Sequence, residues 1–308
     1  MRHVFWMRLI VALALSISVL VPANESIGWG FWAHKQIHRR AVQAMPEPIA
    51  AFFREYSTFL IEHSIDADDR RRIDPTEAEQ HFIDIDRYGS YPFPELPRRF
   101  EEAVKKYTLD TVRANGVLPW RIAAFSDSLV HAFKAKNLDR ILYFAVNVGH
   151  YVADAHVPLH TTENYDGQLT GQKGLHARWE SEIPERYMRH YETKNETVPR
   201  AKYIADKTEE SFKWVLESYL MVDSVLKCDL KAKEGLKPEE IYTIVIDRNG
   251  REREVYTPLY YERFKEALGD MVERRFEQTI ERVASVWYSA WVDAGKPDLK
   301  ELMCKSRE

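Results

Sequence analysis

The spacing of hydrophobic residues along the chain predicts a mostly helical protein. In several segments apolar residues return every three or four positions, which places them on one side of an α-helix. The segments with this pattern are residues 33–45, 49–61, 98–114, 119–134, 138–154, 200–226 and 259–292. Residues 66–96 are charged and then rich in Tyr, Pro and Gly, so they predict a loop.

One segment departs from the helical pattern. Residues 242–246 (YTIVI) and 251–256 alternate in character, and Asn249-Gly250 between them favours a tight turn. We interpret 242–256 as a β-hairpin inserted into a helical body. No internal repeat is evident, so the predicted fold class is all-α: a single multi-helix domain with one small β-hairpin.

The first 28 residues have the features of a secretory signal. Arg2 and Arg8 flank the start of the apolar run Leu9–Val21, and small residues, Ser26 and Gly28, stand at the third and first positions before a cleavage point. The alternative is a retained membrane anchor, although the run is short for one. The predicted organisation is a signal peptide at 1–28 and a helical domain at 29–308, secreted or periplasmic, with Trp29 as its first residue.

Composition and charge are those of a globular protein. Of the 308 residues, 30% are charged and 45% hydrophobic. Without Arg2, Arg8 and Glu25 the domain carries 42 basic and 47 acidic residues, a net charge of −5, which excludes the basic footprint of a duplex-binding protein. A nucleic-acid substrate is not excluded, because bound metal ions supply positive charge. The two cysteines, Cys228 and Cys304, allow one disulfide but no framework.

Histidines and acids recur at spacings typical of metal ligands. His150 and Asp154 are four residues apart in the helical segment 138–154, and His176 and Glu180 repeat this spacing. Two side chains four apart lie on one helix face and can chelate one ion. His160 follows soon after, behind a helix-ending proline. A single pair of this kind is more often a surface hydrogen bond or ion pair, whereas for two pairs with His160 the spacing alone leaves both interpretations open.

Further candidate ligands lie upstream. Asp66 and His81 are 15 residues apart in loop-like sequence, and His34 lies five residues after Trp29. A free amine and carbonyl on Trp29 would chelate a metal together with His34 only after removal of the signal. Taken one at a time, Asp66 also fits a solvated loop acid and His34 a core histidine.

The order of these motifs resembles the superfamily that unites zinc-dependent bacterial phospholipase C with the single-strand-specific nucleases of fungi and plants. The resemblance extends from Trp29 to Glu180, about half of the predicted domain. It rests on these motifs: Trp29-Gly30 with His34, Asp66, HFIDID (81–86), GHYVADAHVPLH (149–160) and LHARWE (175–180).

The resemblance implies three zinc ions in a helical domain. The first would be held by Asp66, His81, His150 and Asp154. The second would be held by the Trp29 amine and carbonyl, His34 and Asp154, and the third by His160, His176 and Glu180. It also implies phosphodiester hydrolysis by metal-bound hydroxide, with the acidic residues Asp66 and Asp84 as catalytic residues.

Several other residues are candidates for supporting roles around the metal ions. Asp84 matches an acid that positions or deprotonates the water, although a solvated loop acid fits as well. His156 is a candidate donor to a ligand carboxylate. Arg70, Arg71 and Arg72 are candidates for a phosphate clamp, against a simple solvated charge run. The remaining histidines considered are expected to be structural or exposed: His38, His63, His131 and His190.

We predict a phospholipase C-like enzyme, with a single-strand-specific endonuclease as the alternative. Glu180, and the segment 161–174 in place of the family's Gly-Gly-Asn, favour a phospholipase C-like enzyme, whereas Trp29-Gly30 and HFID favour a single-strand-specific endonuclease that acts on DNA or RNA. A non-catalytic exported zinc-binding protein is the alternative from another class. Substrate-binding residues are not identified, no protein partner is implied, and a monomer is expected.

Overall fold

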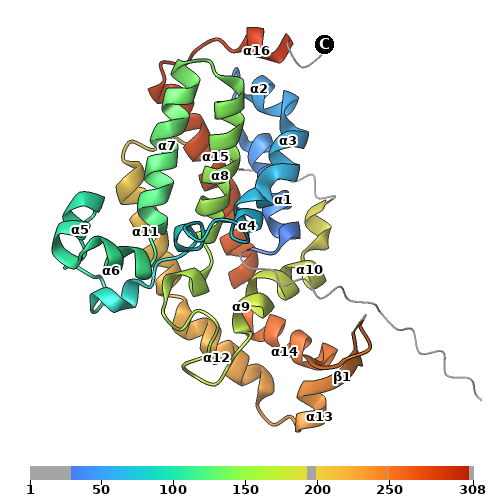
Figure 1. The fold of residues 1–308 in the computed structure, drawn as a ribbon. Helices are drawn as coiled ribbons and strands as arrows, with labels where there is room; N and C mark the ends of the chain where they lie inside the picture. Colours follow the sequence, from blue (N-terminus) through green and yellow to red (C-terminus); the bar gives the residue numbers. More distant parts are fainter. Residues whose placement is uncertain (1–28, 193–198, 248, 305–308) are drawn as a thin grey trace, which may run out of the picture.

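The computed structural model describes residues 29–192, 199–247 and 249–304. The predicted signal segment 1–28 lies outside these residues, as does the side chain of Cys304. The body consists of long helices that run side by side (Figure 1). These are α1 (Phe31–Ala44), α7 (Leu118–Lys134), α8 (Leu138–Asp154), α11 (Lys207–Tyr219) and α15 (Met271–Asp293).

Shorter helices surround this body. On the side of α1 and α8 lie α2 (Ala50–Glu55), α3 (Ser57–Glu62), a 3-10 turn (His63–Ile65) and α4 (Asp66–Arg70). Elsewhere in the chain are α5 (Phe100–Tyr107), α6 (Leu109–Ala114), α9 (Leu175–Ala177), a π-helical turn (Arg178–Glu182), α10 (Ile183–Tyr187), α12 (Val222–Lys233), α13 (Pro238–Ile241), α14 (Pro258–Leu268) and α16 (Lys300–Cys304). Further 3-10 turns are Ala78–Gln80, Ile85–Tyr88, Pro158–Thr161 and Arg189–Glu192.

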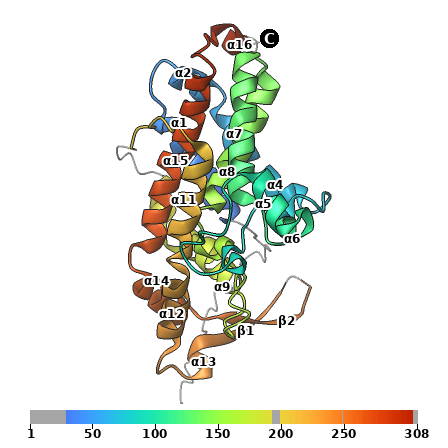
Figure 2. The ribbon, with the colours of Figure 1, turned by 90° about the vertical axis from the view of Figure 1, so that its left-hand side faces the viewer.

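The predicted fold class and the predicted hairpin are both confirmed. Strands β1 (Tyr242–Ile246) and β2 (Glu252–Tyr256) pair antiparallel, with Tyr242 opposite Tyr256 and Ile246 opposite Glu252. The hairpin projects from the end of the molecule that carries α12, α13 and α14 (Figures 1 and 2).

Several of the predicted helical segments are divided in the structure, and part of the predicted loop is helical. Segment 259–292 breaks into α14 and α15 at Gly269, whose φ of +59° cannot continue a right-handed helix. Segment 98–114 breaks at Thr108, whose hydroxyl accepts a hydrogen bond from the Thr111 N–H and so caps α6. Residues 66–70 form a short helix, α4. Their charged residues suggested a solvated loop, but Ala67 and Asp68 are buried.

One continuous hydrophobic core extends from Trp29 to Leu302. Trp287 of α15 lies in it, with its ring stacked on Phe53 at 4.9 Å and its indole N–H donating to the Ala145 carbonyl at 2.8 Å. Burial of such rings supplies most of the stabilisation of a helical body. Within the described residues no helix is both long and apolar enough to cross a membrane.

Helices α1 and α8 approach each other closely at Gly149. A Cβ atom there would lie 2.6 Å from Nε2 of His38, which contacts the Val146 carbonyl at 3.1 Å, and 3.3 Å from the Trp287 ring. Because the closest neighbours belong to a histidine held at both ring nitrogens, they have little freedom to move. The absence of a side chain at Gly149 therefore sets the spacing between the two helices.

We predict that Gly149→Ala lowers the free energy of unfolding by about 1–3 kcal/mol, because the added methyl group overpacks this contact. In an open helical position the same substitution stabilises by about 1 kcal/mol. Chemical denaturation of the metal-free protein measures the change. A higher free energy of unfolding in the variant would contradict the close approach, because an open position predicts an increase and a crowded one a decrease.

Candidate metal centre

Three groups of buried histidines and carboxylates lie at one region of the core. They are His34, His150 and Asp154; Asp68, His81 and His150; and His160, His176 and Glu180. In each group one potential ligand atom per residue lies within 4.8 Å of the others. The residues come from α1, α4, α8, α9, the 3-10 turn at 158–161, the π-helical turn and the end of the 3-10 turn before His81, so the centre exists only in the folded chain.

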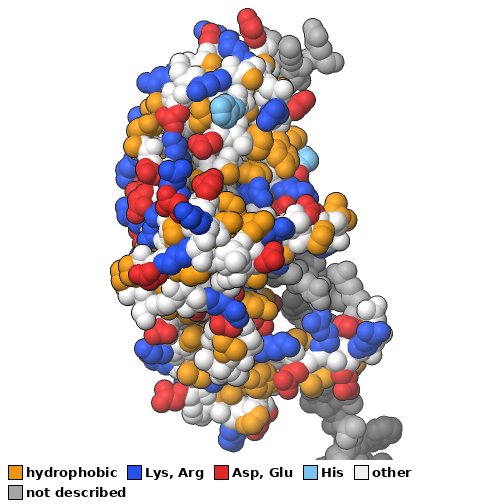
Figure 3. Space-filling model, turned by 60° about the vertical axis from the view of Figure 1, so that its left-hand side comes forward, with side chains coloured by type: hydrophobic (Ala, Val, Ile, Leu, Met, Phe, Trp, Pro, Cys, Tyr) orange, Lys and Arg blue, Asp and Glu red, His pale blue; other side chains and the backbone are white. Residues whose placement is uncertain are grey.

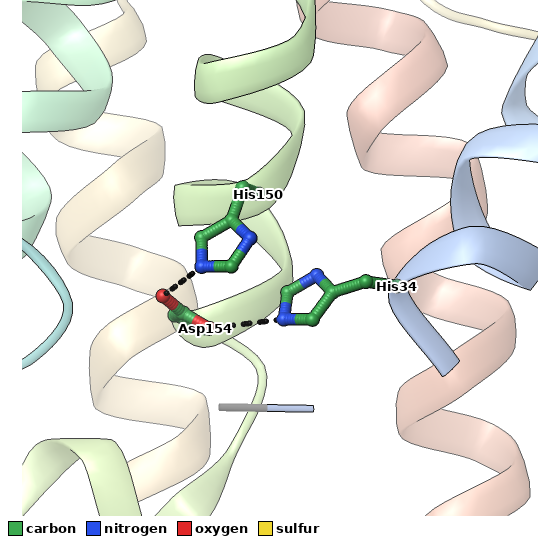
Figure 4. Close-up of side chains that lie close together, drawn as sticks. All are labelled: His34, His150 and Asp154. Atoms are coloured by element: carbon green, nitrogen blue, oxygen red, sulfur yellow. Dashed lines mark ion pairs between the residues drawn. The ribbon is translucent and has the colours of Figure 1, made fainter. Parts of the chain in front are cut away.

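Asp154 joins the first two groups. Its Oδ1 lies 3.6 Å from Nε2 of His34, and its Oδ2 lies 3.4 Å from Nε2 of His150 and 2.9 Å from Nδ1 of His81 (Figure 4 shows His34, His150 and Asp154). Asp68 completes the second group, with Oδ1 at 3.8 Å from both His81 Nδ1 and His150 Nε2. One carboxylate can therefore contact two adjacent ions.

The third group lies around Glu180 in the π-helical turn. Its Oε2 is 2.9 Å from Nε2 of His176 and 3.4 Å from Nε2 of His160. The backbone pairs the His81 and His160 segments, because the Ile83 N–H donates to the His160 carbonyl at 2.9 Å. This pairing holds the third group beside the other two.

The polar atoms in these groups match the needs of metal ions. His150 Nδ1 faces the Ser64 carbonyl at 2.8 Å, and His160 Nδ1 faces the His81 carbonyl. A carbonyl only accepts hydrogen bonds, so each Nδ1 carries the proton and each Nε2 remains a free ligand. Within the part of the chain that the structure describes, buried His34 has no hydrogen-bond partner at either nitrogen, and neither has Asp68 at either oxygen. Such atoms are costly to bury unless a cation contacts them.

The charged residues of these groups shift one another's pKa values. Burial and the neighbouring His150 lower the pKa of His34 well below its usual value, which favours the neutral, ligating form. Burial lowers the pKa of His150 as well, but Asp154 and Asp68 outweigh it and raise that pKa to about 9. The pKa of Asp154 falls well below its usual range because positive charge on His150 and His160 outweighs the effect of burial.

The structure corrects the prediction for Asp66. Its carboxylate is 44% exposed and contacts Nδ1 of His63 at 2.9 Å, so it faces away from the cluster. Asp68 is the acid beside His81 and His150, and burial raises its pKa to about 6. Two residues along a helix rotate a side chain by roughly 200°, which places Asp66 and Asp68 on opposite sides of α4.

Trp29 lies against the ligand-bearing segments. Its indole N–H donates to the Ala153 carbonyl at 2.8 Å, and the Gly30 N–H donates to the Glu180 carbonyl at 3.2 Å. Its ring is buried against Trp179 at 5.1 Å. Because residue 28 precedes it in this chain, ligation by a free Trp29 amine stays a prediction.

The centre reaches solvent on one side. His176 is 15% exposed and the Asp84 side chain 14%, whereas His34, Asp154 and Glu180 are fully buried. Among the described residues Asp84 Oδ1 is buried without a hydrogen-bond partner, and burial together with nearby Asp86 raises the pKa of Asp84 to about 7. Asp84 is therefore not a fully solvated loop acid.

Two other expectations change in the structure. His156 touches no candidate ligand: its Nδ1 faces the Val152 carbonyl and its Nε2 accepts from Arg282 at 2.9 Å. Among the three arginines only Arg71 lies beside the cluster, with Nη1 at 3.8 Å from Asp68. Arg70 pairs with Glu77. Arg72 is exposed and lies 3.6 Å from the carboxylate of Asp69.

Glu77 is a residue near the centre that the sequence interpretation missed. Its Oε1 lies 3.3 Å from Nε2 of His81, on the far side of the ring from Asp154. Burial raises its pKa, but contacts from His81, Tyr151 and Arg70 outweigh burial and lower the pKa to about 2. Its spacing of four residues from His81 repeats the pattern of the other pairs in reverse order.

Comparison with known proteins places this centre in a family. A search of curated proteins finds no match. The family model for S1/P1 nuclease matches residues 32–289, which contain every candidate ligand except Trp29. This family is metal-dependent and hydrolyses phosphoric esters, in agreement with the buried clusters described above. The chain belongs to the S1/P1 nuclease family, within the superfamily of phospholipase C and P1 nuclease.

Proposed function

We propose that this protein is an exported nuclease that uses three zinc ions to hydrolyse phosphodiester bonds of single-stranded nucleic acid. The observation that carries the proposal is the set of three His and carboxylate groups, two of which share His150 and are joined by Asp154 through its contact with His81. Imidazole and carboxylate are typical zinc ligands, and three protein ligands at a site leave room for substrate or water. Export rests on the signal-like segment 1–28.

The residues at the exposed side divide the work of hydrolysis. Bound Zn²⁺ would supply Lewis acidity toward a phosphoryl oxygen and toward the attacking water. Asp84, with its pKa near 7, would take a proton from that water. Arg71, beside Asp68 and 22% exposed, would contact a phosphate oxygen. The partial exposure of His176 and Asp84 argues against a closed, purely structural zinc protein.

The substrate preference changes from the sequence interpretation. The family match favours nucleic acid at least as well as phospholipid. Tyr165, 52% exposed, lies with its ring 6.3 Å from that of His176, a place where a base can stack. On the face in Figure 3, Lys and Arg are interspersed with Asp and Glu, so affinity for a phosphate would come from the ions and local contacts. Glu180 keeps phospholipase C-like activity as the second candidate.

The first prediction concerns the substrate. Zinc-loaded protein, incubated in parallel with single-stranded DNA or RNA, phosphatidylcholine vesicles and bis-p-nitrophenyl phosphate, should release nucleotides, and chelation should abolish the release. His160→Ala should remove activity, whereas exposed His131→Ala is the matched control without effect. Release of diacylglycerol without nucleotides would support the phospholipase instead. Tight zinc binding without any turnover would support the non-catalytic protein.

The second prediction concerns the first residue of the mature protein. Protein that begins at Trp29 should bind three zinc ions, whereas protein extended before Trp29 should lose the ion held by the amine and most activity. Metal content measured by mass spectrometry tests this, with an equal extension at the C-terminus as control. Equal zinc content in all forms would show that the Trp29 amine is not a ligand.

The third prediction concerns pH. Asp84 acts as a base only when ionised, so kcat/KM should rise with pH through about 7. Asp84→Asn should lower kcat about 10²–10⁴-fold and remove this rise. Asp110→Asn, at an exposed position of α6, is the control. A full pH profile that is unchanged in Asp84→Asn would exclude Asp84 as the base.

A further inference from the structure

Glu77 occupies the space behind His81. The His81 ring faces Asp154 and Asp68 through Nδ1, at 2.9 and 3.8 Å, and faces Glu77 through Nε2, at 3.3 Å. His81 is 1% exposed and the Glu77 side chain 8% exposed. The two nitrogens of one buried ring therefore contact the candidate metal site and a carboxylate.

A network of donors fixes the Glu77 carboxylate. Arg70 donates from Nε to Oε2 at 3.1 Å and from Nη2 to Oε1 at 3.3 Å, and the Tyr151 hydroxyl donates to Oε1 at 2.5 Å. Arg70 also donates to the Asn147 side chain. The arginine balances the charge of the buried carboxylate, so its burial is not prohibitive.

The same network connects two segments that carry candidate ligands. Asn147 and Tyr151 flank His150 on α8, whereas Glu77 precedes His81 by one helical turn. Arg70 follows Asp68 by two residues on α4. The contacts of one carboxylate thus determine how the His81 and His150 segments lie relative to each other.

We propose that Glu77 is a positioning residue for the metal centre. In the structure His81 Nδ1 is hydrogen-bonded to Asp154, and Nε2 has no hydrogen-bond partner among the described residues. With an ion at Nδ1, the ring proton would lie on Nε2, 3.3 Å from Glu77 Oε1, and the negative charge of Glu77 would make the imidazole a stronger ligand. Without this acceptor, the proton can reside on either nitrogen and the ring can rotate. The proposal rests on the assignment of His81 as a zinc ligand in the proposed function.

Glu79 offers a matched control on the same turn. It is an acid two residues from Glu77, but its carboxylate pairs with Arg113 at 2.8 Å and, among the described residues, makes no ion pair with His81. Glu79→Gln and Glu77→Gln therefore make the same change of charge at positions that differ in their contact with the candidate ligand.

The test measures zinc binding rather than activity. Metal-free protein is titrated with Zn²⁺ against a competing chelator, and the ring nitrogens of ¹⁵N-labelled histidines are followed by NMR. We expect Glu77→Gln to weaken binding of one ion by roughly 10–100-fold and to change the ring signals of His81. Glu79→Gln should retain the affinity and ring signals of the unmodified protein.

Three outcomes distinguish the possibilities. Equal zinc affinity and equal His81 signals in Glu77→Gln would overturn the positioning role and leave the proposed function intact. Unmodified protein that binds no zinc would overturn both. If Glu77→Gln fails to fold, Tyr151→Phe replaces it, because this variant keeps the carboxylate and removes one of its hydrogen bonds. A severalfold loss of affinity would then support the role, and an unchanged affinity would overturn it.

Discussion

The centre depends on the burial of one carboxylate among imidazoles. Asp154 has no exposed surface, and His34 and His81 from distant segments and His150 of the same helix lie within 3.6 Å of its two oxygens. A buried anion of this kind is stable only beside positive charge. Without an ion the histidines supply it, and His150 holds its proton to a pKa of about 9. Cations that replace these protons satisfy the carboxylate and free the imidazole nitrogens together.

The helices are arranged so that this charge stays in place. The turn after Asp154 is held from α15 and α11, because Arg275 donates to the His156 carbonyl at 3.0 Å and the Ser218 hydroxyl donates to that of Ala155. On the other side, the absence of a side chain at Gly149 lets α1 bring His34 toward His150. The rings of these two histidines stack with their centroids 3.9 Å apart. Packing far from solvent therefore fixes distances at the centre.

The sequence predicted those parts of the centre that follow from local spacing. His150 with Asp154 and His176 with Glu180 are one helical turn apart, and the hairpin followed from its alternation and its Asn-Gly turn. Asp68 was missed because 66–70 was expected to be a loop. Three acids lie in that stretch, and only the helical rotation of α4 distinguishes the one that faces α8. Glu77 contacts His81 only because tertiary packing buries both, although their spacing carried a signal.

The exposed side of the centre also indicates an order of binding. Asp84, Asp86 and Glu163 gather there, and Arg87 already contacts both Asp84 and Glu163. Asp86 is likewise committed, since it accepts hydrogen bonds from Thr162 and from the Glu163 N–H. An anionic phosphate approaching Asp84 and Glu163 meets negative charge that Arg87 offsets only in part. Ions bound to the buried clusters would reverse the sign of the local field. Metal binding would therefore precede substrate binding, and the same ions that drive hydrolysis would make the site attractive to a phosphoric ester.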